Sequence, residues 1–100
     1  DIKKVNVIKL DSLIKNLEIK RIKLLKIEAE GYEPEVLLGA KDSLKICEYI
    51  AVDGGYERGL KEEQTFTELT NYLIKNGFEI FDIYFPWCRA LFKNSLISKN

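Results

Sequence analysis

Apolar residues recur along the chain with two different periods, and the two periods alternate. Short runs rich in β-branched and aromatic residues predict strands, whereas apolar residues spaced three and four positions apart predict helices. The predicted strands span residues 5–10, 21–28, 49–53, 78–85 and 89–93. The predicted helices span residues 11–17, 34–44 and 63–76, and Gly77 suits the C-terminal cap of the third helix.

Strands that alternate with helices predict an α/β fold with a mostly parallel sheet and right-handed crossovers. The last two strands, joined by a turn at Pro86 and Trp87, form a hairpin that adds one antiparallel strand. One hundred residues are enough for one small domain or for a fragment of a larger one. In such an open sheet, ligands bind beyond the carboxyl ends of the strands.

The same periods predict which apolar side chains are buried. Strand 21–28 has apolar residues on both faces, so we expect helices to cover it on both sides. The helix positions expected to face the sheet are Leu13, Ile14, Leu17, Val36, Leu37, Ala40, Leu44, Phe66, Leu69, Tyr72 and Leu73. The strand that follows the third helix is expected to pack through Phe78, Ile80 and Phe81. Asp11 and Ser12 are expected to cap the first helix.

Composition narrows the class of protein. Apolar residues make up 46% of the chain and charged residues 32%, as in folded globular proteins. The 16 basic and 16 acidic residues balance, which gives no support to nucleic-acid binding. No apolar run is long enough to span a membrane and no signal peptide opens the chain, so we expect a cytoplasmic protein without a membrane partner. Cys47 and Cys88 are expected to be reduced thiols.

Several kinds of site are missing from the sequence. The chain has no histidine, which excludes Ser-His-Asp and Cys-His catalysis and removes the commonest transition-metal ligand. Neither the dinucleotide fingerprint GxGxxG nor the P-loop pattern occurs. The chain therefore cannot cradle a nucleotide in the usual way.

Carboxylates follow both central strands at their carboxyl ends. Glu28 and Glu30 follow the first of these strands, and Asp53 ends the second. Neighbouring acids repel unless a cation lies between them, and such acids can act as a general base, orient a hydroxyl group or hold a cation. The alternative is a set of solvated loop acids. Glu33 and Glu35 are expected only to complement the dipole of the helix that begins there.

Basic side chains near these acids have two interpretations each. Lys26 precedes Glu28 by two residues, so a regular strand places both on one face, and an ion pair is favoured over contact with substrate. Arg58 and Arg89 are candidate contacts for substrate or an anion, and otherwise solvated cations. Trp87 and Tyr56 either line a pocket or close the core.

Residues 24–44, LLKIEAEGYEPEVLLGAKDSL, closely resemble the signature of the FkbM family of methyltransferases. The segment KLDSLI, residues 9–14, is similar to the LD-containing segment of that family. The family pattern places a lysine, two spaced acids, a glycine, a further acid and the motif VLxGA at fixed spacing. The matching positions in this chain are Lys26, Glu28, Glu30, Gly31, Glu33, Val36, Leu37, Gly39, Ala40 and Leu44.

This resemblance implies a Rossmann-like class I methyltransferase fold, S-adenosylmethionine as cofactor, and methyl transfer to a hydroxyl oxygen of a sugar or another small metabolite. The position of the acids and the resemblance agree on catalytic roles for Glu28 and Glu30, and we expect substrate-binding roles for Lys26, Asp53 and Arg58 from their places at the strand ends and in the following loop. The family usually has aspartate where this chain has Glu28, and glutamate is common where it has Asp53. The Glu28 side chain is longer than that of aspartate by one methylene group. Three alternatives are therefore open: Glu28 retains the role of that aspartate, shifts it or loses it.

The glycine-rich cofactor loop of the family belongs to an earlier strand and helix, which have no counterpart in this chain. We therefore expect residues 1–100 to be the C-terminal half of the domain, to supply the acceptor side, and not to bind S-adenosylmethionine alone. A half-sheet exposes the edge strand that the missing half would pair with, so residues 1–100, if stable alone, are expected to form a homodimer through that edge. The alternatives are a non-catalytic remnant or interaction domain, and a carboxylate-bound Mg²⁺ site.

Overall fold

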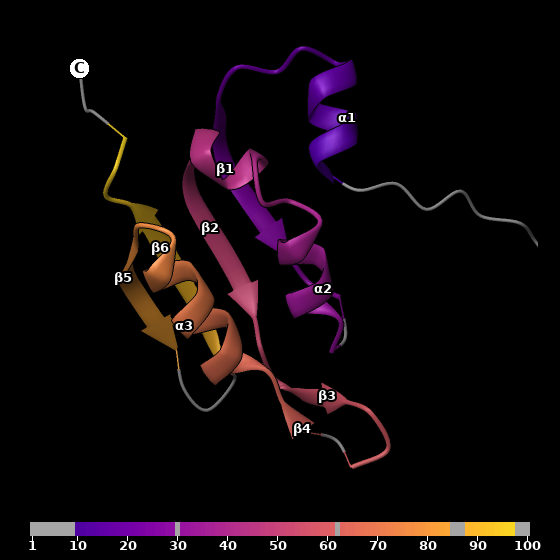
Figure 1. The fold of residues 1–100 in the computed structure, drawn as a ribbon. Helices are drawn as coiled ribbons and strands as arrows, with labels where there is room; N and C mark the ends of the chain where they lie inside the picture. The colour runs from indigo at the N-terminus through magenta and orange to yellow at the C-terminus, as the bar shows by residue number, and fades with distance from the viewer. Residues whose placement is uncertain (1–9, 30, 62, 85–87, 98–100) are drawn as a thin grey trace, which may run out of the picture.

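The computed structural model describes residues 10–29, 31–61, 63–84 and 88–97 (Figure 1). Four strands form the main sheet in the order β1-β2-β6-β5: β1 (Ile22–Ile27), β2 (Cys47–Asp53), β6 (Arg89–Asn94) and β5 (Phe78–Tyr84). Two short strands, β3 (Tyr56–Arg58) and β4 (Glu63–Gln64), pair with each other. β4 occupies the start of the helix predicted over residues 63–76, so that helix begins only at Phe66. The predicted α/β class is confirmed.

The sheet is mixed, and this corrects the expectation of a mostly parallel one. β1 and β2 pair in parallel, but β6 runs antiparallel to both of its neighbours. The C-terminal hairpin β5–β6 forms as predicted, yet β6 is inserted between β2 and β5. Phe92 and Ala90 of β6 thereby lie opposite Ile50 and Val52 of β2, and all four are buried. Burial of these apolar pairs stabilises the inserted position of β6.

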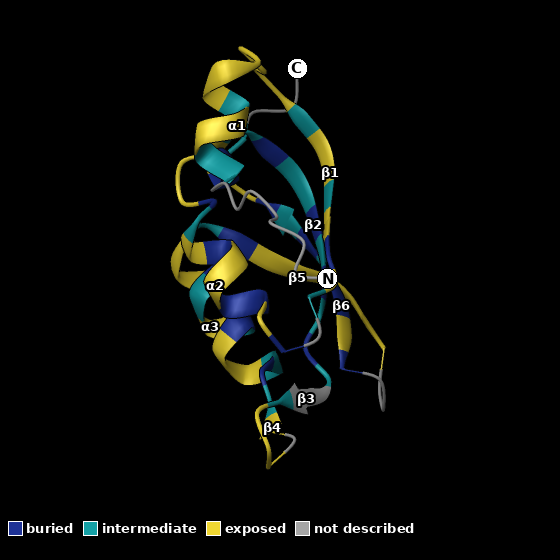
Figure 2. Ribbon diagram, turned by 90° about the vertical axis from the view of Figure 1, so that its right-hand side faces the viewer, coloured by how far each residue is buried: buried dark blue, intermediate teal, exposed yellow. Residues whose placement is uncertain are grey.

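The helices lie on one side of the sheet (Figure 2): α1 (Leu10–Asn16), α2 (Glu33–Leu38) and α3 (Phe66–Lys75). A 3-10 helix, η1 (Ser43–Ile46), follows α2. The core lies between these helices and the sheet, and it includes Ile27, Leu37, Ala40, Leu44, Cys47, Ile50, Val52, Leu69, Leu73, Phe78, Ala90 and Phe92. Within the described residues no helix covers the opposite face, so the expectation that β1 is covered on both sides is wrong there. Leu24 of β1 is 53% exposed.

The predicted helix 34–44 is wrong in its length, because α2 ends at Leu38. Gly39 follows in a turn, where its N–H donates to the carbonyl of Glu35 and the N–H of Ala40 donates to the carbonyl of Leu37. Gly39 carries a high intrinsic cost inside a helix, and the chain restarts as η1 instead of continuing. Pro34 lies in the first turn of α2 as predicted. Leu37, Ala40 and Leu44 are still buried, but Val36 is 37% exposed.

Two further packing expectations are wrong. α1 has no buried residue, and both Leu13 and Leu17 are exposed, because α1 lies at the margin of the fold against η1. Ile80 and Phe81 are also exposed, because β5 is an edge strand of the sheet and is irregular between Ile80 and Asp82. In the predicted strand 5–10, residues 5–9 lie outside the described residues, and Leu10 begins α1. Pro86 and Trp87 also lie outside the described residues.

The third predicted helix is confirmed in its packing. α3 buries Leu69 and Leu73, while Phe66 and Tyr72 pack against the core from its border. Gly77 follows α3 with a φ of 93°, a conformation that glycine adopts readily after a helix. At the other end, the carbonyl of Gly54 accepts the N–H groups of Thr65 and Phe66, each at 3.1 Å. Gly54 therefore connects the end of β2 directly to the start of α3.

Candidate functional site

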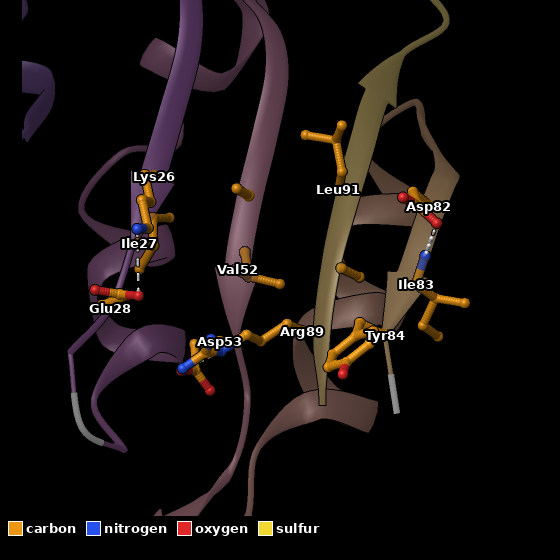
Figure 3. A pocket seen from close by; sticks show the side chains of 12 residues that line it. Lys26, Ile27, Glu28, Val52, Asp53, Asp82, Ile83, Tyr84, Arg89 and Leu91 are labelled. Atoms are coloured by element: carbon orange, nitrogen blue, oxygen red, sulfur yellow. Dashed lines mark hydrogen bonds and ion pairs between the residues drawn. The ribbon is translucent and has the colours of Figure 1, made fainter. Parts of the chain in front are cut away.

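A groove of about 280 Å³ opens where β1 and β2 end, and its lining comes from all four strands of the main sheet (Figure 3). Lys26, Ala51, Leu91 and Asp82 are register partners in adjacent strands and form one row of that lining. Side chains alternate between the two faces of a strand, and the neighbouring residues in β1, β2 and β6 are buried beneath the helices. The groove therefore lies on the sheet face opposite the helices.

Glu28 and Lys26 form an ion pair at one side of the groove. Lys26 Nζ lies 3.4 Å from Glu28 Oε1, and both side chains are more than half exposed. Glu28 directly follows β1, so the alternation of the strand and the end of its pairing place the carboxylate at the carboxyl edge of the sheet. The ion pair expected from the two-residue spacing is confirmed.

Asp53 and Arg89 form the second ion pair of the groove. Arg89 Nε donates to Asp53 Oδ2 at 3.2 Å, and the N–H of Gly55 donates to Asp53 Oδ1, also at 3.2 Å. Asp53 ends β2 and Arg89 begins β6, and the two residues are register partners. The Asp53 side chain is only 17% exposed, so it faces the groove from a more enclosed position than Glu28. Arg89 was predicted as a contact for substrate or an anion, and it is here the partner of Asp53.

Each acid of the groove thus has its own cation, which relieves the repulsion expected between neighbouring carboxylates. Two carboxylates, an ammonium and a guanidinium present hydrogen-bond acceptors and donors close together. Tyr84, the register partner of Arg89, adds an exposed aromatic ring to the lining. Such a set suits a neutral ligand that has several hydroxyl groups.

The turn after β1 contains a buried carboxylate that sequence reasoning assigned only to the helix dipole. Glu33 is 2% exposed, and its carboxylate accepts the N–H of Ala29 at 2.7 Å and that of Gly31 at 3.1 Å. The hydroxyl of Thr65 donates to the same carboxylate at 3.4 Å. The sequence does contain a signal for this role, because Glu33 follows the turn glycine Gly31 by two residues. Glu30, the second predicted catalytic acid, lies outside the described residues.

Arg58 lies beside this turn and is not part of the groove lining. Its guanidinium donates to the carbonyl of Gly31 at 2.7 Å and forms an ion pair with Glu35. The hydrogen bond from Arg58 lowers the pKa of the Glu35 carboxyl, although burial acts weakly in the opposite direction. The structure therefore brings Lys26, Glu28 and Asp53 together in the groove and places Arg58 next to it. A substrate-binding role for Arg58 stays a prediction.

A second hollow, of about 480 Å³, lies between α1 and η1. The carboxylate of Asp11 there accepts the N–H groups of Asp42 and Ser43, at 3.0 and 2.7 Å, and the hydroxyl of Ser43 at 2.6 Å. Burial alone would raise the pKa of Asp11, but these hydrogen bonds and Lys45 bring it below its ordinary value of 3.8. Asp11 lies inside α1 and binds the start of η1, so its prediction as the cap of α1 is wrong.

Cys47 and Cys88 are both buried free thiols, which confirms the expectation of reduced cysteines. Burial raises the pKa of the Cys47 thiol to about 11, so this residue is unsuited to act as a nucleophile. Across the described part of the chain, no three histidine, cysteine or acidic side chains gather in a way that could hold a metal ion. Among the described helices, none is long and apolar enough to cross a membrane.

Comparison with known proteins gives one match. A family model described as "Methyltransferase FkbM domain" matches residues 1–80 of the chain, which includes β1, β2, the turn between β1 and α2, and α3. No curated protein matches the chain, and no solved structure matches it. The match covers Lys26, Glu28 and Asp53, while Tyr84 and Arg89 of the groove lie beyond it.

Proposed function

The chain belongs to the FkbM family of methyltransferases, and from this premise we propose that it supplies the acceptor side of an S-adenosylmethionine-dependent O-methyltransferase. In this proposal the groove holds the hydroxyl group that receives the methyl group, and the acceptor is a sugar or another small polyhydroxylated metabolite. The observation that carries the proposal is the meeting of two ion pairs, Lys26–Glu28 and Arg89–Asp53, at the carboxyl ends of two parallel strands.

The chemistry of the groove favours a hydroxyl acceptor. A transfer enzyme has to align the acceptor oxygen with the group it receives, and an oriented oxygen reacts far faster than a free one. Glu28 has room to accept a hydrogen bond from an incoming hydroxyl, because its carboxylate is about half exposed and its only described ion-pair partner is Lys26. In the proposal Glu28 orients this hydroxyl and accepts its proton.

The remaining residues bind the rest of the acceptor. Asp53 and Arg89 offer an acceptor and several donors to neighbouring hydroxyl groups, and Lys26 adds a further donor. Tyr84 provides an exposed ring on which the apolar face of a sugar can pack. A pocket with a few convergent polar groups and an aromatic wall fits a small ligand of this kind.

The described residues do not fit S-adenosylmethionine itself. The sequence has no glycine-rich loop, and at the glycine turn after β1 the N–H groups of Ala29 and Gly31 are already bound by Glu33. In the proposal, residues 1–100 therefore form the C-terminal half of a Rossmann-like domain, and cofactor binding belongs to the other half. The order β1-β2-β6-β5, with one antiparallel strand inserted, supports this assignment.

An open sheet edge supports self-association. β1 is the edge strand on the side of the described sheet opposite β5, has six residues and contains no proline that would block pairing. Pairing of this edge with a second copy of the chain would satisfy its outward-facing backbone groups. Sedimentation of residues 1–100 over about a hundredfold range of concentration tests this, because a dimer dissociates on dilution. A monomer throughout the range would contradict the proposed homodimer.

The test of the proposed function identifies the product. The full-length protein is incubated with S-adenosylmethionine that carries a labelled methyl group and with matched sets of sugars, polyols, amines and carboxylates. We expect label to appear in sugars or polyols as an O-methyl ether, identified by mass spectrometry. Label found only in amines or carboxylates would contradict a hydroxyl acceptor, and the absence of any labelled product would contradict methyl transfer.

A further inference from the structure

Two side chains, those of Glu33 and Arg58, bind the two backbone polar groups of Gly31. Its N–H donates to the carboxylate of Glu33 at 3.1 Å, and its carbonyl accepts the guanidinium of Arg58 at 2.7 Å. Gly31 has a φ of 100°, a left-handed conformation that the turn requires and that glycine tolerates. The turn that begins at Glu28 is therefore held from both sides by residues that do not line the groove.

Glu33 is placed to do more than complement the dipole of α2. It is the first residue of α2, yet its carboxylate folds back onto the preceding turn and binds the N–H groups of residues two and four positions earlier. A buried N–H group without an acceptor is costly, so Glu33 selects the turn conformation in which both N–H groups are satisfied. One of these groups belongs to Ala29, which directly follows Glu28.

Glu33 also connects this turn to the segment after β2. Thr65 donates its hydroxyl to Glu33 at 3.4 Å and its N–H to the carbonyl of Gly54 at 3.1 Å. Gly54 directly follows Asp53. A continuous chain of hydrogen bonds thus runs from the residue after Glu28 to the residue after Asp53, behind the groove that these two acids share.

Arg58 binds the same turn from its outer side, through the carbonyl of Gly31. It comes from β3, and besides Gly31 it binds Glu35 on the exposed side of α2. The hydrogen bond to Glu35 and the charges of Glu35 and Glu68 raise the pKa of Arg58 above its ordinary value. Arg58 therefore connects the β3–β4 hairpin to the same turn that Glu33 holds from within.

We propose that Glu33 and Arg58 are positioning residues, which fix the turn after β1 and thereby set the place of Glu28 relative to Asp53. The inference rests on the proposed function of the groove. In it, Glu33 and Arg58 affect the rate of methyl transfer and do not affect the binding of the acceptor. In this proposal neither residue touches the acceptor, because neither lines the groove, and the positioning role takes the place of the substrate-binding role predicted for Arg58. A misplaced Glu28 slows the step that needs an aligned hydroxyl, while the groove still binds the acceptor through Asp53, Arg89 and Lys26.

The experiment uses the full-length protein and three variants: Glu33→Gln, Arg58→Ala and the control Glu79→Gln, which changes an exposed carboxylate of β5. Glutamine at position 33 replaces one acceptor oxygen with a donor group, so one N–H of the turn loses its partner. Hydrogen exchange at the Ala29 and Gly31 amides is measured first, because it requires no catalysis. We expect exchange about tenfold faster in Glu33→Gln than in the control.

Steady-state transfer to the acceptor that the product test identifies is measured second. We expect kcat to fall by about tenfold or more in Glu33→Gln and Arg58→Ala, with the acceptor KM within about twofold of wild type. Arg58→Lys, which keeps the charge, should restore part of kcat, and an effect of stability alone would not separate kcat from KM. If Glu33→Gln fails to fold, Arg58→Ala and the pair Thr65→Val and Thr65→Ser carry the same comparison.

Each outcome decides one point. If hydrogen exchange at both amides is unchanged in Glu33→Gln, the claim that Glu33 fixes the turn is wrong. Faster exchange with unchanged kcat, or with a rise in KM alone, would overturn the positioning role. An inactive wild-type protein would contradict the proposed function and, with it, the positioning role of Glu33 and Arg58. The exchange rates would still show whether Glu33 holds the turn.

Discussion

Arg89 and Asp53 face each other across the β2–β6 pair, with Arg89 Nε 3.2 Å from Asp53 Oδ2. The contact depends on the direction of β6. Because β6 runs against β2, it brings its first residue to the edge where β2 has its last. A parallel strand in the same place would bring its own last residue there instead. The antiparallel insertion therefore supplies a cation to the carboxyl end of the sheet, where parallel strands deliver acids.

We predict that Arg89→Gln affects acceptor binding far more than stability. The Arg89 side chain is 58% exposed, and the less exposed Asp53 keeps its hydrogen bond from the Gly55 N–H, so loss of this ion pair should change the free energy of unfolding by only about 1 kcal/mol. Loss of the guanidinium removes several donors from the groove, so the acceptor KM should rise by about tenfold. Chemical denaturation and steady-state kinetics measure the two effects. The control is Lys23→Gln, which breaks the exposed pair with Glu48 away from the groove; an equal rise of KM in both variants would contradict the prediction.

We predict that Gly54→Ala destabilises the fold strongly. A Cβ atom at Gly54 would lie 2.5 Å from the Cα atom of Phe66, and backbone cannot move aside as a flexible side chain can. Overpacking of this kind costs about 3 kcal/mol in the free energy of unfolding, measured by denaturant titration. Gly59→Ala is the matched control: a Cβ there meets no atom of the described residues within 4 Å, and its φ of 70° opposes the change, at about 1 kcal/mol. A smaller loss for Gly54→Ala than for Gly59→Ala would refute the close approach.

We predict that the hydrogen bonds of Asp11 make part of the free energy of unfolding depend on pH. Its carboxylate accepts three hydrogen bonds from Asp42 and Ser43, and its pKa in the folded chain lies below the ordinary value of 3.8. A carboxyl group with a lowered pKa stabilises the fold above its unfolded pKa, and this contribution is lost as the pH falls through the folded pKa. Asp11→Asn should therefore be less stable than wild type at neutral pH, and the difference should shrink below about pH 3.8.

Denaturant titrations at several pH values measure this difference. Asp42→Asn is the control, because Asp42 is exposed and its carboxylate pairs only with Lys45 among the described residues. A difference between wild type and Asp11→Asn that stays constant from neutral to acid pH would show that the hydrogen bonds to η1 do not favour the ionised carboxyl.

The sequence predicted the parts of the fold that depend on local pattern. Strand β1 follows from its apolar residues, and the Lys26–Glu28 pair follows from the alternation of a strand. The break at Gly39 was missed because the apolar spacing of Leu37, Ala40 and Leu44 fits a continuous helix, and the contacts that favour a restart come from Asp11, about thirty residues earlier.

The missed part of the site depends on contacts between distant segments. Nothing near Arg89 in the sequence indicates that β6 is inserted beside β2, so the partner of Asp53 could not be read from local pattern. Glu33 was read as one acid of a helix start, because its second role needs the turn at Gly31 and the hydroxyl of Thr65 to come together. Glu30 was predicted from its place after β1 and from the family resemblance, and because it lies outside the described residues its role stays a prediction.

The central claim is that Glu28 acts on the acceptor hydroxyl, and Glu28→Gln in the full-length protein tests it most directly. The turnover of labelled S-adenosylmethionine and its affinity by calorimetry are measured for Glu28→Gln, with Glu79→Gln as the exposed-acid control. We predict that kcat falls by about a hundredfold or more while cofactor affinity stays near wild type, because a general base contributes on that scale. Turnover equal to that of Glu79→Gln would contradict the claim and leave Glu28 only as the partner of Lys26.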